Sequence, residues 1–165
     1  MLRVAGWREI GLGVDALHLT WDGQGWRRYP RGMRTISLRL RPGTDLKAEL
    51  VALAAREGVR AGWLLTCVGS LSRVRLRLAG GTEHGTCQGL LEIVPLTGTL
   101  SSDGGHPHLA VANHQGRTVG GHLAEGSIVR TTAEVVLAAD DRLVFAREHD
   151  PATGYDELVV RERDP

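Results

Sequence analysis

Three histidines in one stretch of the chain have the residue type and spacing that a metal site needs. In GHPHLAVANHQGRTVGGHL, residues 105–123, His106 and His108 are two apart, and His122 follows a turn. Pro107 fixes its own φ at about −65° and disfavours helical geometry at His106, so an extended strand is expected here. Side chains two apart in a strand point to the same face. His106 and His108 are therefore predicted to share one face.

The length of the turn that follows determines whether His122 lies on the same face as His106 and His108. A three-residue loop over residues 114–116, with Gly116 in the left-handed position, is a common hairpin connection. That loop would pair Asn113 with Arg117, and counting back it would set His108 directly opposite His122, with Cβ atoms about 5 Å apart. A slip of one residue would move His122 to the other face.

The other residues of the hairpin support this register. One face would be apolar and suited to a core, and the histidine face would carry small residues that leave room around a cluster. The first set is Leu109, Val111, Val119 and Leu123, and the second is Ala110, Ala112, Thr118 and Gly120.

Three converging imidazoles form the open type of site that zinc uses when it keeps one position for water or substrate. Nickel, copper and iron bind similar ligands, so the sequence predicts Zn²⁺ or another divalent transition metal. The alternative is three solvent-facing histidines on a polar hairpin. Glu125 and Asp103 flank the cluster in sequence, and Glu125 is the candidate for catalytic proton transfer.

The elements that must position this hairpin are mostly strands. One helix is expected over residues 44–58, capped by Thr44 or Asp45, with its apolar residues on one face and Gly58 as its stop. Those apolar residues are Leu46, Leu50, Leu53 and Ala54. Turn-length connections between the strands favour an α+β fold with a mainly antiparallel β-sheet.

Among the strands predicted before the hairpin, two are consecutive and separated near Gly69. The first covers residues 61–70, and the second alternates Leu71, Val74, Leu76 and Leu78, as core residues, with Arg73, Arg75 and Arg77. A bulge is expected near Ser72, and a polar loop over residues 80–89.

Composition indicates an ordinary soluble protein. The 165 residues suggest one domain, with a terminal extension over residues 1–33 and the domain over residues 34–162. No apolar run reaches the ~20 residues of a membrane span, and the first residues lack a signal peptide, so a cytoplasmic location is expected, with no membrane partner. Cys67 and Cys87 are expected to be buried free thiols.

The net charge of +1 excludes a strongly basic nucleic-acid binder. A local basic run nevertheless covers Arg27, Arg28, Arg31, Arg34, Arg39 and Arg41, with no acidic residue between Asp22 and Asp45. This run is either a solvated linker and strand face or a nucleic-acid arm in which Trp26 and Tyr29 stack on bases.

Several blocks of the sequence, taken in order, resemble the PPC domain family, which plants and prokaryotes share. They are GSLSRVRLR, LEIVPLTGTLS, GGHPHLAVANHQGRTVGGHL, TTAEVVL and FAREHDPATGYDELVV, and the resemblance spans about residues 34–160. It implies a single PPC-like domain whose antiparallel sheet is flanked by helices and which assembles as a homotrimer. It also implies a metal held by an HxH…GGH pattern, here His106, His108 and His122.

Three functions stay open from the sequence. The first is a metal-binding homotrimer of undetermined activity that takes a small-molecule ligand at the metal. The second is a metal-dependent hydrolase or lyase. The third is a DNA-associated regulatory protein, although the Arg-Gly-Arg-Pro AT-hook of plant relatives does not occur in this chain.

Overall fold

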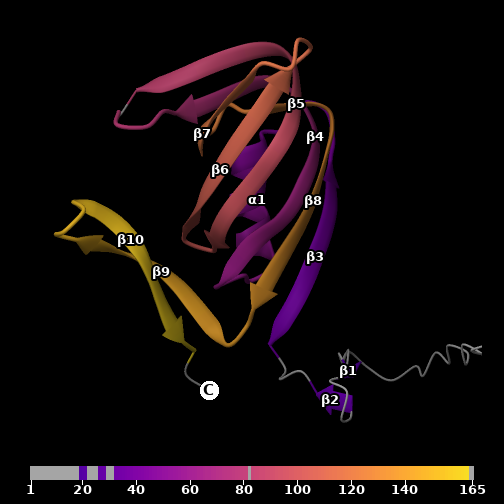
Figure 1. Ribbon diagram of the computed structural model, residues 1–165. Helices are drawn as coiled ribbons and strands as arrows, with labels where there is room; N and C mark the ends of the chain where they lie inside the picture. Colours follow the sequence, from indigo (N-terminus) through magenta and orange to yellow (C-terminus); the bar gives the residue numbers. More distant parts are fainter. Residues whose placement is uncertain (1–18, 22–25, 29–31, 82, 164–165) are drawn as a thin grey trace, which may run out of the picture. The chain divides into compact units, whose positions relative to one another are not determined.

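The structure is a computed structural model that describes residues 19–21, 26–28, 32–81 and 83–163 (Figure 1). The chain divides into two units, residues 1–31 and 32–165. In the first unit, β1 (Leu19–Trp21) pairs antiparallel with β2 (Trp26–Arg28), so that Trp21 opposes Trp26.

The second unit is built on a six-stranded antiparallel sheet in the order β3-β8-β4-β5-β6-β7. The strands are β3 (Met33–Leu40), β4 (Gly62–Arg77), β5 (His84–Ser101), β6 (Gly104–Asn113), β7 (Thr118–Leu123) and β8 (Ile128–Asp140). Neighbouring strands within this sheet are mostly joined by tight turns, which is the topology that the short connections in the sequence predicted.

Helix α1 (Leu46–Arg56) covers one face of the sheet. Asp45 is its N-cap: the carboxylate Oδ1 accepts a hydrogen bond from the backbone N of Ala48 at 3.1 Å. The four predicted apolar residues of the helix are all buried and join the core, which confirms the helix and its inward face; they are Leu46, Leu50, Leu53 and Ala54. Asp45, and not Thr44, is thus the cap.

The predicted break at Gly69 is wrong, because β4 runs without interruption over 16 residues. What changes there is the pairing register with β8, which shifts between Gly69 and Leu71. The predicted bulge near Ser72 is confirmed by a register shift between Leu71 and Arg73. Leu78 lies beyond the end of β4 and is 45% exposed, so its assignment to the core is wrong.

The predicted polar loop over residues 80–89 is also mostly strand. β5 begins at His84 and pairs with β4 from Arg77 backward, so the loop is confined to the tip of a long hairpin. Hydrophobic alternation is weak in this segment because Cys87 is its one apolar residue and is only half-buried. With little apolar burial to fix a period, the sequence carried no strand signal there.

Four of the strands close on themselves. β4 pairs with β5, β5 with β6 and β6 with β7, and β7 returns to pair with β4 at Leu76 and Arg77. A final hairpin, β9 (Leu143–Asp150) with β10 (Tyr155–Glu162), forms a separate two-stranded sheet after β8 (Figure 1).

The α+β class with a mainly antiparallel sheet is confirmed, but the expected flanking helices are not. Over the described ranges α1 is the only helix, and none is long and apolar enough to cross a membrane. Cys67 is a buried free thiol as expected, whereas Cys87 is free but only half-buried.

Candidate metal centre

The turn between β6 and β7 is the predicted three-residue loop. The backbone N of Asn113 donates to the carbonyl of Arg117 at 2.9 Å, and Gly116 N donates to the Asn113 carbonyl at 2.9 Å. Gly116 has φ +75°, the left-handed conformation that a glycine adopts at little cost. The Asn113 side chain accepts from the backbone N of Gln115 and of Arg117, both at 3.0 Å, and so fixes the loop length.

This loop sets the predicted register. His108 lies directly opposite His122, and His106 is two residues along on the same strand. On the other face Leu109, Val111 and Leu123 are buried, and Val119 packs against the core. The hairpin register predicted from the sequence is thus confirmed.

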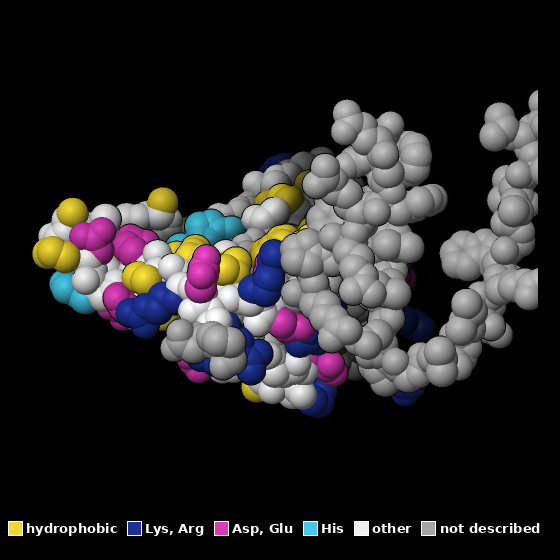
Figure 2. All heavy atoms as spheres, turned by 90° about the horizontal axis from the view of Figure 1, so that it is seen from below, with side chains coloured by type: hydrophobic (Ala, Val, Ile, Leu, Met, Phe, Trp, Pro, Cys, Tyr) yellow, Lys and Arg dark blue, Asp and Glu magenta, His cyan; other side chains and the backbone are white. Residues whose placement is uncertain are grey.

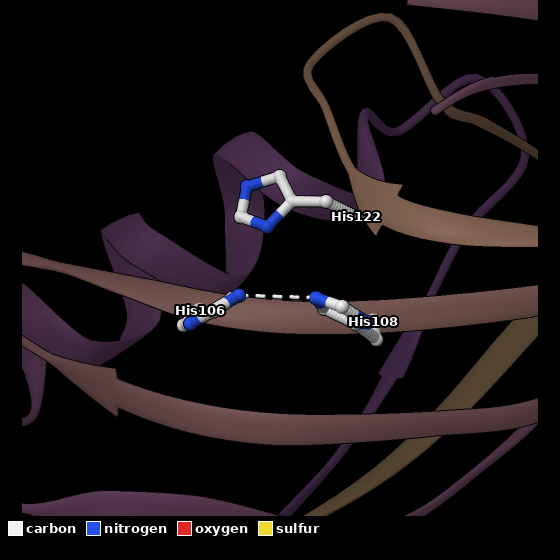
Figure 3. A group of neighbouring side chains, drawn as sticks. All are labelled: His106, His108 and His122. Carbon is white, nitrogen blue, oxygen red and sulfur yellow. Dashed lines mark hydrogen bonds between the residues drawn. The ribbon is translucent and has the colours of Figure 1, made fainter. Parts of the chain in front are cut away.

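The three rings converge on one point (Figure 3). Nε2 of His106 lies 3.0 Å from Nε2 of His108, and one of the two donates a hydrogen bond to the other. Ring centroids are 4.9 Å apart for His106 and His108, 5.0 Å for His106 and His122, and 5.6 Å for His108 and His122. One ligand atom from each ring can be chosen so that no two are more than 4.8 Å apart.

These residues fit a tetrahedral metal. Zn–N bonds of about 2.0–2.1 Å at tetrahedral angles put ligand nitrogens about 3.3 Å apart, close to the observed His106–His108 separation. Nδ1 of His122 is buried and has no hydrogen-bond partner among the described residues. Buried polar atoms normally have a partner, so an ion at the centre of the cluster would account for this atom.

The surroundings keep two of the rings neutral. Burial, followed by the Arg77 charge, lowers the pKa of His122 to about 4. Burial and the charge of Arg147 also lower the pKa of His106. Neutral imidazole has a free lone pair, so both residues are ready to bind a cation at neutral pH without first releasing a proton.

The close approach of β7 to β4 brings Arg77 to the cluster. Arg77 is the cross-strand partner of His122, and a Cβ added to Gly121 would lie 2.7 Å from the Arg77 carbonyl oxygen. Only glycine therefore allows the two backbones to pair here without moving apart.

A cavity of about 750 Å³ opens beside the histidines. His106 and His122 line it, and so do both flanking acids that the sequence singled out, Glu125 and Asp103. Figure 2 shows histidine side chains at the surface, on a face that also carries acidic and basic side chains. Glu125 is therefore near the cluster, but it is not among the ligand group that the structure brings together.

Three cations of this cavity were missed by the sequence analysis: Lys47, Arg77 and Arg147. They come from α1, β4 and β9, and only the β4–β7 pairing and the position of the last hairpin bring them to the histidines. Arg77 belonged to an alternation that was correctly interpreted as a non-core face, but nothing in the sequence indicates what that face adjoins.

The remaining described histidines are exposed, as expected. His84 and His114 lie in turns or strand ends, and His149 is 3.8 Å from Asp156. His18 lies outside the described residues.

Comparison with known proteins identifies the family. Residues 27–140 match the model of the Plants and Prokaryotes Conserved (PCC) domain, the family that the sequence resemblance named as PPC. The chain belongs to the PCC domain family. The bifunctional protein GlmU of Synechococcus sp. (strain JA-3-3Ab) is 51% identical to it over 130 residues, which cover 79% of this chain. The match spans only 21% of that relative's length.

Three solved structures share the PCC fold. A hypothetical protein from Salmonella cholerae-suis is 40% identical with a TM-score of 0.78, and the match covers 79% of this chain and 95% of that one. A candidate DNA-binding protein from Bacteroides thetaiotaomicron is 21% identical (TM-score 0.65; 80% and 94% covered). A metal-containing protein from Archaeoglobus fulgidus is 22% identical (TM-score 0.61; 76% and 93% covered).

Proposed function

We propose that this PCC-domain protein binds one divalent transition metal per chain, zinc in the first instance, through His106, His108 and His122. The convergence of three imidazoles, with the buried Nδ1 of His122 lacking a partner, is the observation that carries the proposal. The relative from Archaeoglobus fulgidus that is named as metal-containing supports it.

Three histidine ligands leave one metal position for a small-molecule ligand. A metal held there would supply Lewis acidity. Glu125 lines the same cavity, which supports the alternative of a metal-dependent hydrolase or lyase in which Glu125 would take or give a proton. No described feature selects a reaction within those classes, so the activity is left undetermined.

We further propose that the protein works as a homotrimer, as the family resemblance implies. Apolar side chains stay exposed on two adjacent central strands, with Val68 of β4 53% exposed and Val94 of β5 56% exposed. Central strands that present large apolar side chains to solvent are typical of an interaction surface.

The DNA-associated alternative has weaker support. The relative from Bacteroides thetaiotaomicron named as a candidate DNA-binding protein favours it. However, Arg34 of the basic run is engaged within the protein, since it donates to the Glu57 carbonyl and lies 3.3 Å from Asp141. Arg31 and Tyr29 lie outside the described residues. DNA affinity that falls steeply with salt, and falls again in an Arg27→Ala/Arg28→Ala variant, would favour this alternative.

Calorimetric titration of metal-free protein with Zn²⁺ tests the metal site. We expect one zinc per chain in the wild type, and an affinity more than about 100-fold lower in His122→Ala, because a lost ligand costs more than the 10–100-fold of a lost supporting contact. His114→Ala is the matched control, since His114 is exposed in the β6–β7 turn outside the cluster. Equal zinc affinity in all three proteins would refute the proposal.

A further inference from the structure

The cavity beside the histidine cluster is lined by three cations from three separate elements. Lys47 comes from α1, Arg77 from β4 and Arg147 from β9, and all three share the cavity with His106 and His122. A second cavity, of about 290 Å³, is lined by His106 and His108 and shares Arg147 with the first. Three positively charged side chains thus share the space beside the cluster.

Each cation is positioned next to a histidine by a contact of its own. Arg77 is the direct cross-strand neighbour of His122. Lys47 Nζ donates to the carbonyl of Gly105, the residue before His106, at 3.2 Å. The third cation, Arg147, is positioned by a side chain of the large sheet.

Nη2 of Arg147 donates to Oγ1 of Thr99 at 3.2 Å, and Thr99 is the cross-strand partner of His106. Nη1 of Arg147 donates to the Asp156 carbonyl at 3.5 Å, and the N–H groups that make neither contact can donate to a carboxylate.

Carboxylates of the protein also line the cavity, namely Asp103, Glu125, Asp156 and Glu157. The contacts of the three cations nevertheless place them beside the histidines, with Arg77 opposite His122 and with Lys47 and Arg147 next to His106. A divalent ion at the cluster would add further positive charge beside them.

We propose that the cavity binds a small organic carboxylate, whose anionic end faces the three histidines and is held by Lys47, Arg77 and Arg147. The inference rests on the proposed metal site and names the ligand class of that site. A volume of about 750 Å³ is in the range of small-molecule pockets and exceeds what a simple inorganic ion fills. The acidic side chains that line the cavity would then contact hydroxyl or amino groups of the same ligand.

Titration of Co²⁺-loaded protein with succinate tests this inference, because the visible absorption of Co²⁺ responds to a change in its ligand environment. We expect a saturable spectral change with succinate and none with neutral succinamide. Binding should weaken by about 10- to 100-fold in Arg77→Gln and again in Arg77→Gln/Lys47→Met, as expected for the loss of charge-assisted hydrogen bonds. Arg75→Gln, the same charge change on the same strand but outside this cavity, should bind as the wild type does.

The cobalt content of every sample separates the two proposals. Full cobalt loading with no succinate response, with equal binding of succinamide, or with no effect of Arg77→Gln would overturn the inference and leave the metal site standing. A response to inorganic phosphate alone would overturn the carboxylate assignment. Failure of the wild type to bind cobalt would overturn both.

Discussion

At the scale of single residues, the histidines are set apart by what surrounds them. His106 and His122 are held in their neutral form by burial and nearby cations, whereas His84 and His114 are solvent-exposed. Judged by residue type alone, all of these histidines would be equal candidates for metal ligands. The spacing of His106 and His108 around Pro107, and the hairpin count to His122, were enough to select the right three for the cluster.

Asp140 is the single buried carboxylate over the described ranges, and its charge is balanced by Arg142. The Asp140 side chain accepts from Arg142 Nε and backbone N at 2.9 Å each and from Nη2 at 2.6 Å. These hydrogen bonds hold the pKa of Asp140 below its usual value. A carboxyl with a lowered folded pKa stabilises the fold above its unfolded pKa of about 3.9, and this stabilisation is lost as the pH falls through the folded pKa.

We therefore expect Asp140→Asn to lower the free energy of unfolding at pH 7 by about 1–3 kcal/mol. The difference in the free energy of unfolding between the wild type and this variant should narrow as the pH falls below about 4. Urea unfolding at a series of pH values measures both. Asp141→Asn is the control, since the Asp141 side chain is 44% exposed and its pair with Arg34 should contribute about 1 kcal/mol or less. A gap that does not change with pH would contradict the role given to the Asp140 charge.

At the scale of elements, the β6–β7 hairpin and its return to β4 build the site. The hairpin could be predicted because a three-residue loop, an apolar face and a small-residue face all required the same register. The β4–β7 pairing could not, because it joins strands that are distant in the sequence through backbone hydrogen bonds, which leave no side-chain pattern. The start of β5 was missed for a different reason: Cys87 is the one apolar residue over residues 84–89, so the sequence shows no period there.

Gly121 tests how much that return of β7 matters. In Gly121→Ala the new Cβ would lie 2.7 Å from the Arg77 carbonyl oxygen, so β7 must move away from β4 and take His122 with it. We expect a loss of about 1–3 kcal/mol in the free energy of unfolding. Zinc affinity should fall by at least about tenfold, as when a supporting contact of a metal ligand is lost.

Gly85→Ala is the matched control for this change. Gly85 is also a strand glycine, but a Cβ there meets nothing closer than the Leu78 side chain, at an ordinary 3.6 Å. Chemical denaturation and zinc calorimetry on both variants give the comparison. Gly121→Ala with unaltered stability and zinc affinity would show that the site does not depend on the β4–β7 contact.

At the scale of the whole molecule, the family could be identified from ordered sequence blocks, and the family model confirms it. The expected flanking helices reduce to α1 in the described residues, because the strand-rich sequence has only one segment with helical periodicity and a cap. The division at residue 33 and the trimer stay predictions. Neither follows from the physics of one isolated chain, since the exposed apolar side chains show a surface but not what covers it.

Light scattering on the purified protein tests the assembly. We expect three times the chain mass of 17.8 kDa for the wild type. Val68→Asp places a charge on the exposed apolar face of β4 and should shift the protein toward the monomer. Ala55→Asp, on the exposed side of α1, should leave the mass unchanged. A wild-type protein with the mass of a single chain would contradict the proposed trimer.

The metal site is the central claim, and elemental analysis of protein purified without an affinity tag tests it most directly. The comparison is between the wild type and the His106→Ala/His108→Ala/His122→Ala variant. About one transition-metal ion per chain in the wild type, absent from a folded variant, is the predicted result. The same metal content in both proteins, or none in a wild type that also fails to take up added zinc, would contradict the claim and reduce the three histidines to a polar face of the hairpin.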